Sequence, residues 1–210
     1  MPLNEYALIK KIGHISKTSK MPCYSWSRSA FNCNYTDPLC IKLCYAKRHH
    51  YNYSNVKDAL AKNEEIYYSE DWVKNFTMFL KDFVDAKYFR WFDSGDLQGD
   101  LILMGKIGQI ADQCPDIKFW MPTRDKEILK QYKRKVRMKL NKRHPNLIIR
   151  LSADNVDTDP NYKLADQLGV LVSSVKSAIA MCKAKENGGQ CGSCRVCWSD
   201  KVKEVSYYLH

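Results

Sequence analysis

Three cysteines in one short segment are the residues of this 210-residue chain best suited to chemistry. They have the spacing Cys33-x6-Cys40-x3-Cys44 and lie in a Cys-rich segment over residues 23–46. Three thiolates from one loop can hold three irons of a [4Fe–4S] cluster and leave the fourth iron open to a small ligand such as S-adenosylmethionine. Cys23 is near enough in sequence to be a fourth ligand, and a zinc site is the alternative. Zinc sites normally contain two close C-x2–4-C pairs, so the spacing favours iron–sulfur.

A second cysteine group near the C-terminus has the spacing Cys182-x8-Cys191-x2-Cys194-x2-Cys197. The C-x2-C-x2-C run is the arrangement with which bacterial ferredoxins wrap three thiolates around a cluster. Cys182 completes a set of four ligands, so we expect a coordinatively closed metal site over residues 182–198. Iron–sulfur is the favoured content, and a four-cysteine zinc knuckle is the alternative.

Composition and the absence of targeting signals favour reduced thiols. The first residues contain no basic segment followed by an apolar run, and no apolar stretch approaches the ~20 residues that span a bilayer. We therefore expect one domain over residues 1–210, with no membrane association, in the cytosol, where disulfides are rare. Nine cysteines is also an odd number. Cys114 has no partner nearby in sequence and is expected to be a buried structural thiol.

Helix and strand patterns alternate along the chain. After a short strand near residues 6–9, helical spacing of apolar residues covers 55–83, as two helices, and then 101–114 and 126–140. Apolar strand patterns cover 88–92, 117–122, 146–151, 169–175 and 202–210. Nearly continuous apolar strands between helices are typical of an α/β protein with a mostly parallel sheet and outer helices. The chain is shorter than the ~250 residues of a full (β/α) barrel, so we expect a partial (β/α), or TIM-like, barrel with Cys-rich metal-binding loops in its N- and C-terminal parts.

Polar residues follow the predicted strands, and ligands of α/β sheets bind at these strand ends. The acidic end of the strand at 88–92 could bind the amine and ribose of a cofactor, with helix capping as the alternative. Two arginines at later strand ends could clamp a carboxylate or phosphate, with ordinary ion pairs as the alternative. The sequence assigns no catalytic residue. The candidate cofactor-binding residues are Ser94, Gly95, Asp96, Arg124, Arg150 and Ser152.

The chain is basic, with a formal net charge of +11. Lysine and arginine are concentrated in residues 126–143. A basic helix face could lie along the phosphates of a nucleic acid. The alternative is the solvated face of an amphipathic helix.

Six motifs in order resemble the phage family called gene product 88. The resemblance covers nearly the whole chain and implies a phage or prophage origin, hence a bacterial host cytosol, but no particular reaction. The motifs are Lys20-Met21-Pro22, Cys40-x3-Cys44-Tyr45-Ala46, the segment 90–97 (RWFDSGDL), the segment 120–124 (WMPTR), the segment 149–153 (IRLSA) and Cys191-x2-Cys194-Arg195-x-Cys197-Trp198.

At a greater distance the chain is similar to radical S-adenosylmethionine enzymes. Those enzymes place a three-cysteine loop after the first strand of a partial barrel and a small cofactor-binding motif after the second. Cys33, Cys40 and Cys44 match the loop, and the segment 94–96 matches the motif. The usual spacing is C-x3-C-x2-C, and position 47 is lysine here, so the third thiolate has to be Cys33. The second motif also differs from the usual Gly-Gly-Glu-Pro.

The combined expectation is a phage-encoded iron–sulfur protein. The first [4Fe–4S] cluster is expected on Cys33, Cys40 and Cys44, with chemistry like that of radical S-adenosylmethionine enzymes. A second cluster is expected on the C-terminal cysteines. The alternative is a nucleic-acid-binding or host-interaction protein without catalysis, stapled by zinc or a cluster.

Overall fold

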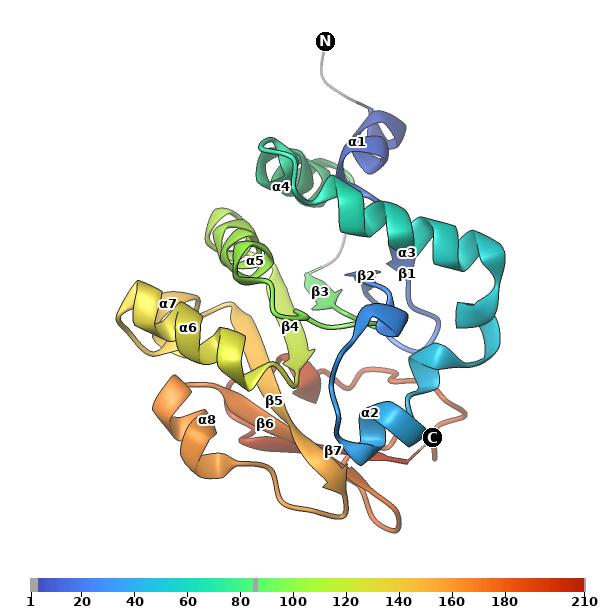
Figure 1. Cartoon of the computed structure of the whole chain (residues 1–210), viewed down its shortest axis with the longest axis vertical. Coiled ribbons are helices and arrows are strands. Elements are labelled where there is room, and N and C mark those ends of the chain that lie inside the picture. Colours follow the sequence, from blue (N-terminus) through green and yellow to red (C-terminus); the bar gives the residue numbers. More distant parts are fainter. Residues whose placement is uncertain (1–3, 85–86, 210) are drawn as a thin grey trace.

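The computed structural model describes residues 4–84 and 87–209, and its centre is one seven-stranded sheet in which neighbouring strands follow chain order (Figure 1). β1 pairs antiparallel with β2, and every later pair is parallel. The strands are β1 (Ile15–Lys17), β2 (Tyr24–Trp26), β3 (Tyr88–Trp91), β4 (Lys118–Thr123), β5 (Leu147–Val156), β6 (Leu171–Lys176) and β7 (Glu204–Tyr208).

Helices connect the parallel strands along one side of the sheet. Right-handed crossovers between strands in chain order put successive helices on the same face, and Figure 1 shows α4, α5, α6 and α8 following one another around the strands. The helices are α1 (Glu5–Ile12), α2 (Pro38–Lys42), α3 (Ser54–Ile66), α4 (Trp72–Asp82), α5 (Leu101–Gln113), α6 (Lys126–Val136), α7 (Leu140–Arg143) and α8 (Tyr162–Leu168). The mostly parallel α/β sheet with outer helices is confirmed. Curvature into a partial barrel stays a prediction.

Two local predictions were wrong. The segment predicted as a strand near residues 6–9 belongs to α1, because Asn4 caps a helix by accepting from the Ala7 N–H, and Leu8 and Ile12 share its buried face. The helix predicted over 126–140 is two helices. Arg137 has a left-handed backbone (φ 55°), which ends α6 and separates it from α7.

The larger core lies between the sheet and its helices. Alternate strand residues such as Phe89, Trp91 and Phe119 face the helices, where α4 presents its apolar side. The indole N–H groups of Trp26 and Trp72 both donate to the Ile12 carbonyl, which fixes the end of α1 against this core. The expected buried Cys114 also lies in this core.

The opposite face of the sheet is covered by the C-terminal segment. Trp198 packs with Trp120 and Val205 in a second buried cluster, and its indole N–H donates to the Phe89 carbonyl at 2.9 Å. This contact joins residues far apart in sequence and holds the second cysteine group over β3 and β4, on the face of the sheet opposite the helices. We call this face the inner face. None of the helices within 4–84 and 87–209 has the length and apolar character needed to cross a membrane.

Arg150 occupies the interior of β5 and is completely buried. Its guanidinium donates only to backbone carbonyls, most of them in the C-terminal segment, and burial lowers its pKa. The accepting carbonyls belong to Val172, Val196, Cys197, Ser199, Val202 and Lys203. The expectation that Arg150 ends a strand at a ligand-binding rim is therefore corrected, because the side chain has neither exposed surface nor a free donor.

We expect Arg150→Met to lower the free energy of unfolding by about 3 kcal/mol or more, since several buried carbonyls lose their donor at about 1–3 kcal/mol each. Denaturant unfolding measures the change. Arg134→Met, at an exposed position on α6, is the matched control and should change stability by less than about 0.5 kcal/mol. Equal stability of the two variants would contradict this role.

His144 joins three helices. Its buried ring stacks on Tyr132 at an interplanar angle of 14°. One ring nitrogen shares a hydrogen bond of 2.9 Å with the Tyr132 hydroxyl, and the other shares one of 2.7 Å with the Asp112 carboxylate. Gly108 is required beside it, because a Cβ there would lie 2.5 Å from the Tyr132 hydroxyl. Burial lowers the pKa of His144, although Asp112 opposes that effect.

Because the folded state binds the His144 proton less readily than the unfolded chain, stability should fall as pH drops below about 6.5. His144→Gln should weaken that pH dependence. Urea unfolding across this pH range measures it, with His14→Gln at an exposed position as control. A variant with the wild-type pH dependence would show that another group titrates.

Candidate metal and ligand site

The first cysteine group lies in the connection that leaves the carboxyl end of β2. Cys33 follows the 3-10 turn Ala30–Asn32, Cys40 is in α2, and Cys44 precedes the turn Tyr45–Lys47. The Asp37 side chain caps α2 by accepting from the Cys40 N–H at 3.1 Å. All three thiols are partly exposed. The three thiols therefore lie in one connection, in which α2 is capped locally, at the edge of the sheet where the parallel strands end.

Burial and neighbouring charges raise the pKa values of two of these thiols. Burial raises the pKa of Cys33 to about 11 and that of Cys40 to about 12. Negative charge on Cys44 raises both pKa values further, whereas a Gln98 hydrogen bond lowers the first and Arg124 lowers the second. Without a bound cation, Cys33 and Cys40 are therefore neutral thiols at pH 7.

Side chains from two later strand ends contact this connection. Gln98, after β3, donates to the Cys33 sulfur at 3.3 Å and to the Ser29 carbonyl at 2.8 Å. Arg124, after β4, donates to Asp37 at 3.1 Å and to the Ala153 carbonyl of β5 at 2.6 Å. α2 accordingly lies beside β5 (Figure 1). The ion pair considered for Arg124 exists, but Asp37 from the cysteine connection is its partner.

The segment 94–96 lies next to Arg124 and ties strand ends together. Asp96 is buried, and its carboxylate accepts from Thr123 Oγ1 at 2.5 Å and from the Arg124 N–H at 2.8 Å. Burial raises the pKa of Asp96 to about 6 against these hydrogen bonds. Gly95 has φ 73°, and a Cβ would lie 2.6 Å from the Arg28 carbonyl oxygen. A side chain at Gly95 would therefore separate the connections after β2 and β3.

The capping alternative for this segment was wrong, because Asp100 caps α5 by accepting from the Leu103 N–H at 2.8 Å. Ser94 is different from its neighbours. Its buried hydroxyl has no hydrogen-bond partner within 4–84 and 87–209, which leaves an unsatisfied polar atom beside this rim. Ser152, on β5, contacts the Ser173 hydroxyl of β6 at 3.2 Å.

The second cysteine group lies on the inner face of the sheet, at the end opposite to the first cysteine group. The Cys191 N–H donates to the Lys20 carbonyl and the Cys182 N–H to the Ser206 carbonyl, each at 3.0 Å. Burial raises the pKa of Cys197 to about 11, and the pKa of Cys191 is raised by burial and by negative charge on Cys182 and Cys194. Cys182 therefore acts on both Cys191 and Cys197.

Cys23 lies with the second cysteine group. It packs in the same buried cluster as Cys191 and Cys197, and burial raises its pKa, with a smaller contribution from Cys191. Its position immediately before β2 puts it at the opposite end of that strand from the connection that holds Cys33. The suggestion that Cys23 completes the first site is therefore corrected.

Arg90 lies between the two groups and was not singled out in the sequence. Its guanidinium stacks over Trp120, at 4.8 Å from the ring centroid, and donates to the Tyr45 hydroxyl at 3.2 Å. A second N–H faces the Met21 sulfur at 3.7 Å. Tyr45 follows Cys44, and Met21 is two residues before Cys23. A lone arginine within the apolar strand at 88–92 was the available sequence signal.

No three His, Cys, Asp or Glu side chains surround a single ion position in the described parts of the chain. In a tetrahedral zinc site with Zn–S of ~2.3 Å, the sulfurs would lie about 3.8 Å apart. The donor set at Cys33, Cys40 and Cys44 is chemically suited to a cluster that spreads its ligands over separate irons. Which metal either group binds stays a prediction.

Comparison with known proteins gives a family but no activity. No curated protein and no solved structure matches the chain. The family model described as Gene product 88 matches residues 5–186, a span that includes the first cysteine group, the segment 94–96 and Cys182. Since this match covers most of the sequence, the chain belongs to the gene product 88 family.

Proposed function

We propose that this chain is an iron–sulfur protein whose first [4Fe–4S] cluster is held by Cys33, Cys40 and Cys44 and keeps one iron open for a small ligand. The observation that carries the proposal is the position of the thiols. They lie in the connection at the carboxyl end of β2, and side chains that follow β3 and β4 reach the same connection. Ligands of parallel α/β sheets bind at this edge.

The proposed ligand is S-adenosylmethionine, as in the radical enzymes that the arrangement resembles. Parallel strands in chain order and a three-cysteine connection after the first of them support this assignment. Cys33, Cys40 and Cys44 would hold the cluster, which, when reduced by an external reductant, would supply the one electron needed to cleave the sulfonium carbon–sulfur bond of the ligand.

The side chains around the thiols suit a bound ligand in different ways. Arg124 can exchange part of its bond to Asp37 for a ligand carboxylate, because a guanidinium binds carboxylates in a bidentate manner. The Ser94 hydroxyl has an unused hydrogen-bonding capacity, and the Ser152 hydroxyl can serve as a second polar contact. Asp96 and Gly95 position this rim by holding the connections together.

The origin and location of the protein belong to the same proposal. A phage origin would put the chain in a bacterial host cytosol, where thiols stay reduced and can bind metal. The second cluster is proposed on Cys182, Cys191, Cys194 and Cys197, with a closed structural or electron-transfer role. Zinc at either group is the competing content, and a colourless protein would favour it.

The decisive experiment is anaerobic purification followed by iron and sulfide counting. We expect about eight irons per chain for the wild type and about four for Cys44→Ala, because loss of one of three ligands releases the first cluster. Cys114→Ala is the matched control, since this buried thiol lies among core residues, and should keep the wild-type iron content. Unchanged iron in Cys44→Ala would refute the first site.

The open iron is tested on the same samples by EPR of the dithionite-reduced protein. Addition of S-adenosylmethionine should change the wild-type spectrum and leave the spectrum of Cys44→Ala unchanged. A wild-type signal that does not respond, with four or more irons per chain, would restrict the clusters to a structural or electron-transfer role.

Substitution of Cys23 gives a second test. Together with Cys23, the second cysteine group has five thiols for four proposed ligand positions. We expect Cys197→Ala to lose about four irons and Cys23→Ala to lose none, since Cys23 precedes β2 and packs against the second group from the side of the sheet. Iron counting measures both. Loss of iron in Cys23→Ala together with full iron in Cys182→Ala would mean that Cys23, and not Cys182, is the fourth ligand.

A further inference from the structure

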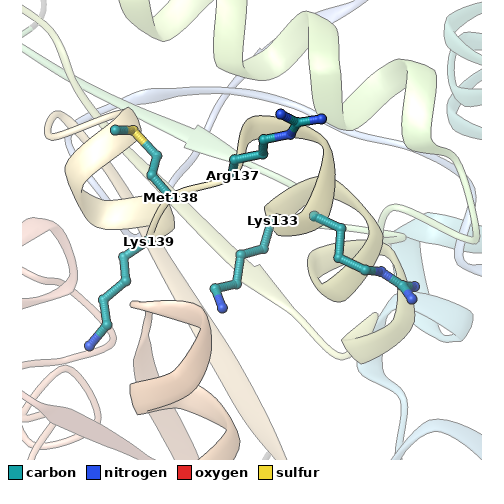
Figure 2. A pocket seen from close by; sticks show the side chains of 5 residues that line it. Lys133, Arg137, Met138 and Lys139 are labelled. Carbon is teal, nitrogen blue, oxygen red and sulfur yellow. The ribbon is translucent and has the colours of Figure 1, made fainter.

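The junction of α6 and α7 forms a concavity of about 390 Å³ lined by Lys133, Arg134, Arg137, Met138 and Lys139 (Figure 2). Its shape follows from the break in the predicted helix. The left-handed Arg137 ends α6 with a bond from its N–H to the Lys133 carbonyl at 2.9 Å. The chain then turns, and the Asn141 N–H at the start of α7 donates to the Gly169 carbonyl at 2.9 Å. A single straight helix would not make this hollow.

Four of the five lining side chains are cations, and none of them forms an ion pair within 4–84 and 87–209. Cations near this surface differ in that respect, because Lys126 pairs with Asp154 and Arg143 with Asp112. Figure 2 shows Lys133, from α6, and Lys139, from the turn before α7, extending to the same side. Like charges held this close repel one another, and a bound anion would relieve that repulsion.

We propose that this basic surface, defined by Lys133, Arg134, Arg137 and Lys139, binds the phosphate backbone of a nucleic acid. The cations are spread over the end of α6 and the turn that follows it, which suits a row of phosphates better than one compact anion. Apart from the partly buried Lys133, these side chains are exposed and long, so they provide charge without a rigid cage. The net charge of +11 supports attraction to a polyanion.

The same surface predicts binding that does not depend on base sequence. Phosphate contacts position a protein on nucleic acid, whereas base contacts determine its sequence preference. The remaining lining residue is the apolar Met138, which is 44% exposed and offers no hydrogen bond to a base edge. Affinity should therefore fall steeply with salt and vary little between sequences.

The test is fluorescence anisotropy of the full chain with a short labelled DNA duplex and the matching single strand, across a salt series. The variant is Lys133→Ala/Arg137→Ala/Lys139→Ala. The matched control is Lys62→Ala/Lys74→Ala/Lys81→Ala, which removes the same charge from exposed positions on α3 and α4. We expect the first variant to lose about tenfold or more in affinity at low salt, and the slope of log K against log salt to shrink by roughly three. The control should keep a slope close to that of the wild type.

Two results would overturn the proposal. Equal losses in the two variants would mean that only total charge matters. Failure of the wild type to bind either strand form, or its displacement from DNA by modest inorganic phosphate alone, would mean that the concavity receives a small anion or an acidic partner. Circular dichroism confirms folding of each variant. Because no cysteine is changed, iron content and this result test separate properties.

Discussion

The inner face of the sheet depends on the hydrogen bonds of the buried Arg150 guanidinium. A buried cation without a carboxylate partner would be strongly unfavourable unless its donors were satisfied. Backbone carbonyls of Val196, Cys197 and Ser199 provide that satisfaction, and all three come from the segment that carries the second cysteine group. These hydrogen bonds thus keep the segment against β5.

Once the C-terminal segment is held there, the remaining contacts of the inner face follow. Trp198 reaches the Phe89 carbonyl and packs against Trp120, whose ring lies beneath the Arg90 guanidinium. Arg90 in turn contacts Tyr45, which follows the first cysteine group. The two groups, well separated in sequence, are therefore connected through side chains of β3 and β4. A change in one group would alter packing against the other through this short path.

The sequence allowed prediction of features that depend on local patterns and on residue spacing. The apolar strands, the helix with Trp72 and Phe76 on one face, and the two cysteine groups could be identified because periodicity and spacing are local. The segment near residues 6–9 was misassigned because a short apolar run fits either element, and the cap at Asn4 decides between them. The break at Arg137 had no signal, since a left-handed backbone is uncommon outside glycine.

Predictions about individual site residues failed where tertiary contacts decide. Arg150 looks like a residue at a strand end until β5 is seen to continue through Val156. Cys23 is closer in sequence to Cys33 than to Cys191, yet the return of the C-terminal segment brings Cys191 beside it. Asp96 does not cap the following helix, and it accepts from Thr123 and the Arg124 N–H across neighbouring strand ends, while its role in ligand binding stays a prediction. None of these contacts is encoded by spacing within one segment.

The electrostatics of the first cysteine group suggest how it would select its contents. Burial and the nearby carboxylates Asp37 and Asp96 make thiolates unfavourable, which raises the pKa values of Cys33 and Cys40 and keeps an empty site neutral. A bound metal centre reverses this balance, because coordination to iron stabilises thiolate and releases protons. Assembly should therefore be coupled to proton release and be favoured as pH rises.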